Sequence, residues 1–343
     1  MTYTHIQALR GLLCIGVAVI HVKIYLLRQG EPSFFIHVPD ILGGIPCAFF
    51  AVSGYFMAFL VDRNSPNFLV QRLVRVYPMY VIVIALSFLL RLFTDNQMRL
   101  DDLPQVLSLL PHGTGHNYKL GIEWTLLYEI WYYFLCAIFC RKGWTRYFPA
   151  FLLAWLFACI FMNTVSFYPP PMLPNVLNIW FSVWNVSFIL GALVYYFMQR
   201  SSEATTYMWT GYVLLGMAAV SCALIAKMYT VLYVLSGVAV ALLWGLIKLE
   251  KYCSSPKLLV QYGDYSYTLY LLHTNVILVT FDRWSAFTGT KPGPITGLIA
   301  LVLCIGGAWF LGQVDVNVHA RLRKWVSAKL KPKPVPVPVR AES

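Results

Sequence analysis

The sequence predicts an all-α, polytopic membrane helix bundle of about ten transmembrane helices. Hydrophobic residues make up 59% of the 343 residues and charged residues only 12%, and the mean hydropathy is +0.65. Soluble domains are roughly half apolar and about a quarter charged. The apolar residues are also gathered into runs of about 20 residues, the length needed to cross a bilayer. These observations exclude a disordered chain, a collagen, a disulfide-stabilised secreted domain and a coiled coil.

Ten apolar runs have the length of a membrane span. They are residues 6–27, 41–61, 76–93, 122–140, 147–166, 175–198, 208–226, 228–248, 263–281 and 295–313. The first run is too long for the core of a signal peptide and has no small-residue cleavage site after it, so we expect it to remain as the first span. We expect one membrane-embedded domain over residues 1–325 and a basic, proline-rich cytoplasmic tail over 326–343.

The Lys and Arg residues predict the orientation, because they gather on the cytoplasmic side of membrane proteins. The net charge is +12, from 26 basic and 14 acidic residues. With a cytoplasmic N-terminus, most of the basic residues fall on the cytoplasmic side, so both termini are predicted to be cytoplasmic. In a soluble protein this charge would suggest a nucleic-acid surface. Here the positive charge is explained by the Lys and Arg residues that orient the spans in the membrane, and no nucleic-acid partner is expected.

The cysteines predict neither a metal site nor a disulfide framework. Most of the eight cysteines lie inside apolar runs, none forms a CxxC pair, and no Cys/His cluster has the spacing of a zinc site. Buried cysteine behaves as a small hydrophobe.

Basic residues inside or beside spans are the first candidates for function, since an ionisable group in a span costs about 2.5–3.5 kcal/mol on insertion scales. Arg10 and His21 lie on one helix face, about 16 Å apart by helical rise. The alternative is a purely structural role, in which Arg10 extends its charged end to the membrane surface and His21 is a hydrogen-bonded core residue. Arg72 and Arg75 share a face at the predicted cytoplasmic mouth, where guanidinium forks suit phosphate groups. The alternative is simple topological anchoring.

Three further candidates come from other spans. Glu129 is a carboxylate inside a span with no cation in its own segment, so we expect its partner to come from another segment. It shares a face with Thr125, Tyr132 and Tyr133 by helical spacing. Ser53 precedes a glycine, and such a pair usually lets two helices pack closely. His273 is equally suited to a structural and to a catalytic role. By depth, we expect Ser53 and His273 near the middle of the membrane.

The predicted depths arrange these groups along a path. Arg10, Arg72 and Arg75 fall on the cytoplasmic side, whereas His21 and Glu129 fall in the outer third. This layout would suit a phosphorylated donor that enters from the cytoplasm and an acceptor that arrives from the opposite side.

At these residues the sequence resembles the acyltransferase 3 family of integral membrane acyltransferases. Arg10 followed by His21 is similar to the family's Arg-x10-His element. The other similar segments are 49–55 (FFxxSGY), 72–80 (RxxRxxPxY), 124–133 (WTLxxExxYY) and 263–273 (GxxSYxLYLxH). The resemblance covers about residues 5–325. The sequence departs from the family pattern in two places. Ile45-Pro46 stands where Gly-Val is common, and Asp315 with Asn317 stands where Glu-x-Pro is usual. The second departure puts a role for the carboxylate of Asp315 in doubt.

The resemblance implies transfer of an acyl group, usually acetyl from acetyl-CoA, to a hydroxyl of a carbohydrate or related acceptor. Exopolysaccharide, lipopolysaccharide and lipid-linked sugars remain open as acceptors, and the expected location is the bacterial cytoplasmic (inner) membrane. The resemblance also implies essential roles for Arg10 and His21, and a place for Arg72 and Arg75 near the CoA phosphates. Acyl-CoA is then a donor substrate, and no permanently bound cofactor is expected.

The working mechanism makes His21 a general base, since its ordinary pKa suits that role near neutral pH. A covalent acyl-His intermediate is the alternative. Glu129 is the candidate to orient His21, as a carboxylate does in a catalytic triad. Ser53, Tyr132 and backbone amides are candidates to stabilise an oxyanion. A transporter or flippase of a polar solute or glycolipid is the rival function, because it too would place ionisable residues in spans.

Overall fold

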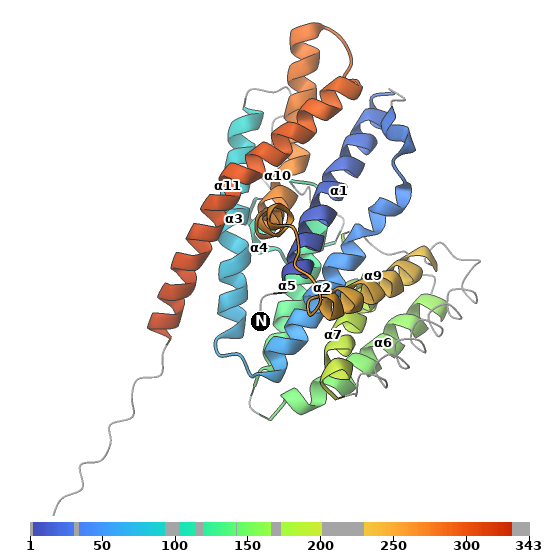
Figure 1. Cartoon of the computed structure of the whole chain (residues 1–343), viewed down its shortest axis with the longest axis vertical. Helices are drawn as coiled ribbons and strands as arrows, with labels where there is room; N and C mark the ends of the chain where they lie inside the picture. Colours follow the sequence, from blue (N-terminus) through green and yellow to red (C-terminus); the bar gives the residue numbers. More distant parts are fainter. Residues whose placement is uncertain are drawn as a thin grey trace, which may run out of the picture.

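The computed structural model describes residues 3–30, 34–92, 103–113, 119–141, 143–165, 173–200 and 230–330. In this part of the chain the fold is a bundle of long helices, which confirms the all-α prediction. The long helices are α1 (Thr4–Arg28), α2 (Ile45–Asp62), α3 (Phe68–Arg91), α5 (Glu123–Phe139), α6 (Phe148–Val165), α7 (Trp184–Arg200), α9 (Thr230–Leu249), α10 (Lys257–Thr288) and α11 (Pro294–Lys329). The short helix α4 (Leu103–Ser108) lies between α3 and α5 (Figure 1).

Nine of the ten predicted spans coincide with these long helices, and the predicted span 208–226 lies outside the described residues. Within the described residues, six helical segments are long and apolar enough to cross a membrane by themselves. α5 and α7 have 17 residues each, and α10 carries charged residues near both ends.

The last two helices are longer than the sequence predicted. α10 has 32 residues and begins at Lys257, and α11 has 36 residues and continues to Lys329. At 1.5 Å per residue α11 is about 54 Å long, whereas the hydrocarbon core of a bilayer is about 30 Å thick. Hydropathy located only the apolar part of each helix, because the polar turns at the ends of α10 and at the C-terminal end of α11 carry no hydropathy signal. Figure 1 shows α11 running the length of the bundle beside α3.

Two glycines bring α1 and α10 into backbone contact. A Cβ atom on Gly263 would lie 2.0 Å from the carbonyl oxygen of Gln7, and one on Gly11 would lie 2.9 Å from that of Leu259. No side chain larger than hydrogen fits at these distances. The two helices run parallel, so residues at similar positions along each of them become neighbours.

A second glycine contact joins α2 to α7. A Cβ atom on Gly54 would lie 2.0 Å from the carbonyl oxygen of Phe188, and one on Gly191 would lie 2.0 Å from that of Ala51. Small residues permit such close approach of membrane helices. The packing interpretation of the Ser53-Gly54 pair is thus confirmed for the glycine.

The N-terminus of α1 is held by a carboxylate from the end of α9. Glu250 accepts hydrogen bonds from the backbone N–H and the hydroxyl of Thr4, and from the backbone N–H of His5 at 3.0 Å. The His5 ring also contacts Glu250, with Nδ1 2.7 Å from Oε2. The first N–H groups of a helix have no partner within the helix, and a carboxylate there also interacts favourably with the helix dipole. Glu250 thereby caps α1 from another part of the chain.

Replacing Gly263 by Ala should force α1 and α10 apart. Overpacking of this kind costs about 1–3 kcal/mol, and we expect a lower midpoint of thermal unfolding for the purified protein in detergent. Gly306→Ala in α11 is the matched control, because a Cβ atom there meets nothing within 4 Å. Equal midpoints for Gly263→Ala and Gly306→Ala would contradict the close contact.

The Glu250 cap predicts a dependence of stability on pH. Partial desolvation raises the pKa of Glu250, but the hydrogen bonds from Thr4 and His5 outweigh it and lower that pKa from 4.5 to about 2. A carboxylate with a lowered pKa in the folded state stabilises the fold above its unfolded pKa, and this contribution is lost as the pH falls toward the folded pKa. Glu250→Gln should therefore be less stable than wild type at pH 6–8, by about 1.5–3 kcal/mol. The difference should shrink as the pH falls from about 4.5 toward 2, and a difference independent of pH would contradict the cap.

Candidate active site

A cavity of about 800 Å³ lies between α1, α2, α3, α5, α10 and α11. This volume is within the usual range of ligand pockets, about 300–1,000 Å³. Its charged lining residues are Arg10, Arg72, Arg75, Arg323, Glu129 and Asp264, with His319 beside them. We call the end of the bundle that carries Arg72, His319 and Arg323 the basic end. Toward the other end the lining includes the aromatic residues Phe49 and Tyr270.

The structure brings five of the predicted site residues to this cavity. They are Arg10, Ser53, Arg72, Arg75 and Glu129. The other three, His21, Tyr132 and His273, do not line it. The predicted path is therefore divided into a polar cavity and a separate pair of histidines.

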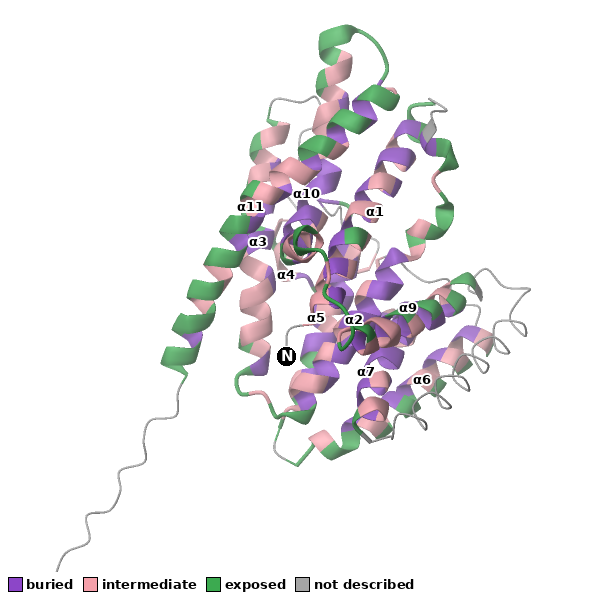
Figure 2. Ribbon diagram, in the orientation of Figure 1, coloured by how far each residue is buried: buried purple, intermediate pink, exposed green. Residues whose placement is uncertain are grey.

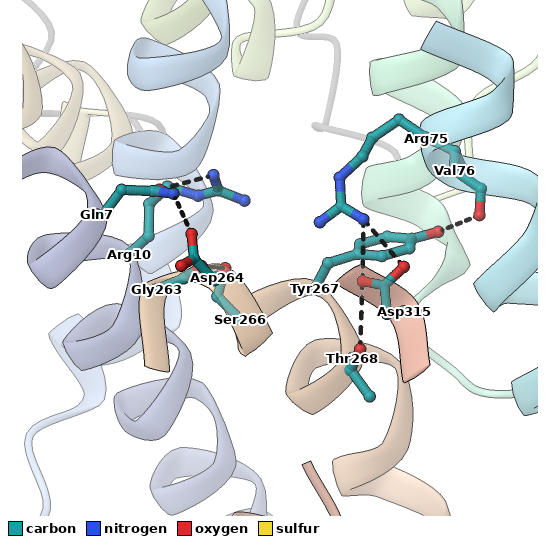
Figure 3. A network of polar contacts seen from close by, with 10 residues as sticks. All are labelled: Gln7, Arg10, Arg75, Val76, Gly263, Asp264, Ser266, Tyr267, Thr268 and Asp315. Carbon is teal, nitrogen blue, oxygen red and sulfur yellow. Dashed lines mark hydrogen bonds and ion pairs between the residues drawn. The ribbon is translucent and has the colours of Figure 1, made fainter. Parts of the chain in front are cut away.

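Arg10 belongs to a short hydrogen-bonded chain between α1 and α10. Its Nη1 atom donates to Oε1 of Gln7 at 3.0 Å, and Nε2 of Gln7 donates to Oδ1 of Asp264 at 2.7 Å (Figure 3). Asp264 immediately follows Gly263, so the close approach of the two helices brings these groups within reach. Gln7 and Asp264 thereby fix the direction in which Arg10 enters the cavity.

Arg75 is paired with a buried carboxylate from α11. Its Nη1 atom lies 3.0 Å and 2.9 Å from the two oxygens of Asp315, whose side chain is only 4% exposed. Thr268 also donates to Asp315, at 3.3 Å. The guanidinium stands 5.1 Å from the ring centre of Tyr267, whose hydroxyl donates to the carbonyl of Val76 (Figure 3). The role of Asp315 that the sequence left in doubt is thus structural support of Arg75.

Glu129 lies in the cavity and not beside His21. Its Oε1 atom accepts a hydrogen bond from the Tyr133 hydroxyl, so a partner comes from its own helix, contrary to expectation. α5 begins at Glu123, one residue from its expected start, so Glu129 lies about as far along its helix as predicted. Glu123 is fully buried and accepts the backbone N–H groups of Lys119 and Leu120 at 2.8 Å and 2.7 Å. The separation of Glu129 from His21 therefore comes from the offset of α1 and α5 along their axes, which hydropathy does not report.

His21 instead packs against His273, with ring centres 4.7 Å apart. The prediction that His273 and His21 lie at different depths is wrong, since their rings are in contact. His273 is about as far along α10 as His21 is along α1. His273 is fully buried, and its Nε2 atom has no hydrogen-bond partner among the described residues.

The hydrogen bond of His21 determines its tautomer. The Nδ1 atom lies 2.8 Å from the carbonyl oxygen of Val17. A carbonyl oxygen only accepts, so Nδ1 carries the proton and Nε2 of the neutral ring has a free lone pair. The same argument applies to His273, whose Nδ1 atom lies 3.3 Å from the carbonyl oxygen of Leu269. The backbone of α1, and not Glu129, thus leaves His21 ready to accept a proton at Nε2.

Tyr132 is a core residue and not an oxyanion candidate. Its ring stacks on Phe188 at 3.9 Å, and its hydroxyl donates to Asn185 at 3.1 Å. The cavity receives Thr125, Glu129 and Tyr133, which follow one another at intervals of four residues. Tyr132 is about 100° further round the helix and faces α7.

Tyr270 connects the cavity with the two histidines. It lines the cavity, its hydroxyl lies 2.7 Å from Oγ1 of Thr125, and its ring centre is 5.7 Å from that of His273. Phe49 packs on its other side, with ring centres 6.3 Å apart. Ring contacts therefore lead from the cavity lining through Tyr270 and His273 to His21.

Several site residues were missed by the sequence analysis. Gln7 and Asp264 orient Arg10, and His319 and Arg323 extend the basic end of the cavity. The available signal was the spacing of Asp315, His319 and Arg323 at intervals of four residues, which indicates one helix face. It was overlooked because the predicted helix ended at residue 313.

A family model described as an acyltransferase domain matches residues 3–313, nearly the whole chain. The chain belongs to the acyltransferase 3 family. No curated protein and no solved structure matches it. Together with the long apolar helices, the family makes this protein a membrane acyltransferase.

The Arg75–Asp315 pair of this acyltransferase is expected to be energetically coupled. Asp315→Asn and Arg75→Gln should each lower stability, and the double variant should lose less than the sum by about 0.5–3 kcal/mol. The free energy of unfolding of the purified protein, measured for both single variants and the double variant, gives this coupling.

Arg72→Gln provides the matched control for that cycle. Arg72 lies one turn from Arg75 and makes no ion pair with Asp315, so Asp315→Asn and Arg72→Gln should act additively. Equal coupling of both arginines to Asp315 would contradict a specific pair.

Proposed function

We propose that this acyltransferase transfers an acetyl group from acetyl-CoA to a hydroxyl of a carbohydrate or glycolipid acceptor in the bacterial cytoplasmic membrane. The observation that carries the proposal is a cavity with four arginines in its lining, close to a pair of histidines. Tyr270 lines the cavity and its ring contacts His273, which in turn packs against His21. The rival function, a transporter, has no comparable support, since the family is one of acyltransferases.

The cavity suits the donor because CoA combines several phosphate groups with a long, thin pantetheine arm. Guanidinium groups bind phosphates through paired, charge-assisted hydrogen bonds. In this proposal the phosphates lie at the basic end, near Arg72 and Arg75, and the arm extends along the cavity toward Phe49 and Tyr270. The basic end then faces the cytoplasm, where acetyl-CoA is made, in agreement with the positive-inside rule.

His21 is proposed as the general base. Its Nε2 atom removes the proton of the acceptor hydroxyl as that oxygen attacks the thioester carbon. The C–S bond then breaks, and the leaving thiolate takes the proton from His21 to give CoA as the free thiol. A covalent acyl-His21 intermediate is the mechanistic alternative.

The remaining candidates support this reaction from the cavity. Arg10 and Glu129 both line it, and we propose that Glu129 balances the charge of Arg10 next to the donor. Ser53 also lines the cavity and is proposed to contact the donor arm. The Val17 carbonyl fixes the His21 tautomer, which removes the need for a carboxylate in that place.

His21→Ala should lower acyl transfer about 10²–10⁴-fold, the usual contribution of a general acid or base. The test is O-acetylation of cell-surface glycans in a deletion strain that carries either wild type or the variant at equal protein level. His37→Ala is the control, because His37 is exposed in a turn between α1 and α2. Normal O-acetylation with His21→Ala would remove His21 from the mechanism. No difference between the deletion strain and its parent would overturn the proposed acceptor class.

A further inference from the structure

The C-terminal turns of α11 continue well past the apolar part of the helix and reach the rim of the cavity. These turns are mostly exposed (Figure 2) and carry His319, Arg321, Arg323 and Lys324. Only His319 and Arg323 of this group line the cavity. They follow Asp315 at intervals of four residues, so the helix face that holds Arg75 also presents these two side chains.

Two of the three arginines at this end of the cavity have no ion-pair partner among the described residues. Arg75 is neutralised by Asp315. Arg72 and Arg323 form no ion pair with any described residue, although both line the cavity. The Nε atom of Arg72 and the Nδ1 atom of His319 are buried without a hydrogen-bond partner in the described part of the chain. Unpaired cations and unsatisfied polar atoms around an open cavity indicate an anionic ligand.

The order of these side chains along the bundle matches the order of groups in CoA. α3 and α11 run antiparallel and meet at the Arg75–Asp315 pair. Arg72 is one helical turn closer to the basic end than Arg75, and Arg323 is two turns beyond Asp315, about 12 Å by helical rise. Arg323 is therefore the outermost arginine of the cavity. In CoA the pyrophosphate follows the pantetheine arm, and the 3′-phosphate on the ribose lies further from the thioester.

We propose that Arg323 binds the 3′-phosphate of the CoA donor, while Arg72 binds the pyrophosphate. This inference rests on the proposed donor. It makes the extension of α11 part of the donor site, and it gives the enzyme a means to distinguish CoA from donors that lack the 3′-phosphate. His319 lies between Asp315 and Arg323 along α11 and completes the basic face.

The test is binding of CoA and of 3′-dephospho-CoA to the purified full-length protein in detergent, by calorimetric titration at fixed ionic strength. Wild type should bind CoA at least tenfold more tightly than dephospho-CoA, the usual contribution of a hydrogen bond between charged groups. Arg323→Gln should weaken CoA binding about tenfold and leave dephospho-CoA binding unchanged, so that the preference disappears. Arg72→Gln should weaken both ligands by a similar factor and keep the preference.

Arg321→Gln is the matched control. It removes the same charge from the same turns of α11, but Arg321 does not line the cavity. It should leave both dissociation constants unchanged. The assignment is overturned if Arg323→Gln keeps the preference for CoA, or if Arg321→Gln reduces it equally, which would show only general attraction of anions. If wild type binds neither ligand, the proposed donor fails together with this inference.

Discussion

The backbone contact between α1 and α10 is the constraint on which the site depends. Gly11 and Gly263 allow the two helices to approach until a single added Cβ would overlap a carbonyl oxygen. Because the helices are parallel, this contact creates two polar levels. Arg10 meets the Gln7–Asp264 chain at one level, and His21 meets His273 at the other. A small change in helix separation would therefore disturb both levels.

The two arginines of the α3 motif have different physical situations despite their similar sequence context. Arg75 is paired with Asp315, which also accepts a hydrogen bond from Thr268, and its guanidinium packs on the Tyr267 ring. These contacts hold Arg75 in place whether or not a ligand is present. Arg72 lines the same cavity without a carboxylate partner. An arginine paired with a carboxylate can still donate hydrogen bonds to a ligand, but the pair carries little net charge. An unpaired arginine attracts an anionic ligand with its full positive charge. The division suggests that Arg75 maintains the shape of the site and Arg72 supplies its attraction for anions.

Predictions of relative depth succeeded for the arginines and failed for Glu129 and His273. Arg10, Arg72 and Arg75 line one cavity, although α3 begins at Phe68 and not at residue 76. Glu129 and His273 were misplaced relative to His21, although α5 begins within one residue of its expected start and α10 extends beyond its expected span at both ends. Hydropathy locates each span along the sequence, but it carries no information about the offset of two helices along their axes.

The sequence by itself determined the fold class, most of the spans, the family and the basic face of α3, because hydropathy, helical period and ordered motifs are local properties of the chain. Only the tertiary structure decided which polar groups meet. It paired Arg75 with Asp315 and His21 with His273, and it turned Tyr132 into the core. These partners come from the axial offset and rotation of each helix, which depend on glycine contacts and buried caps between segments far apart in the chain.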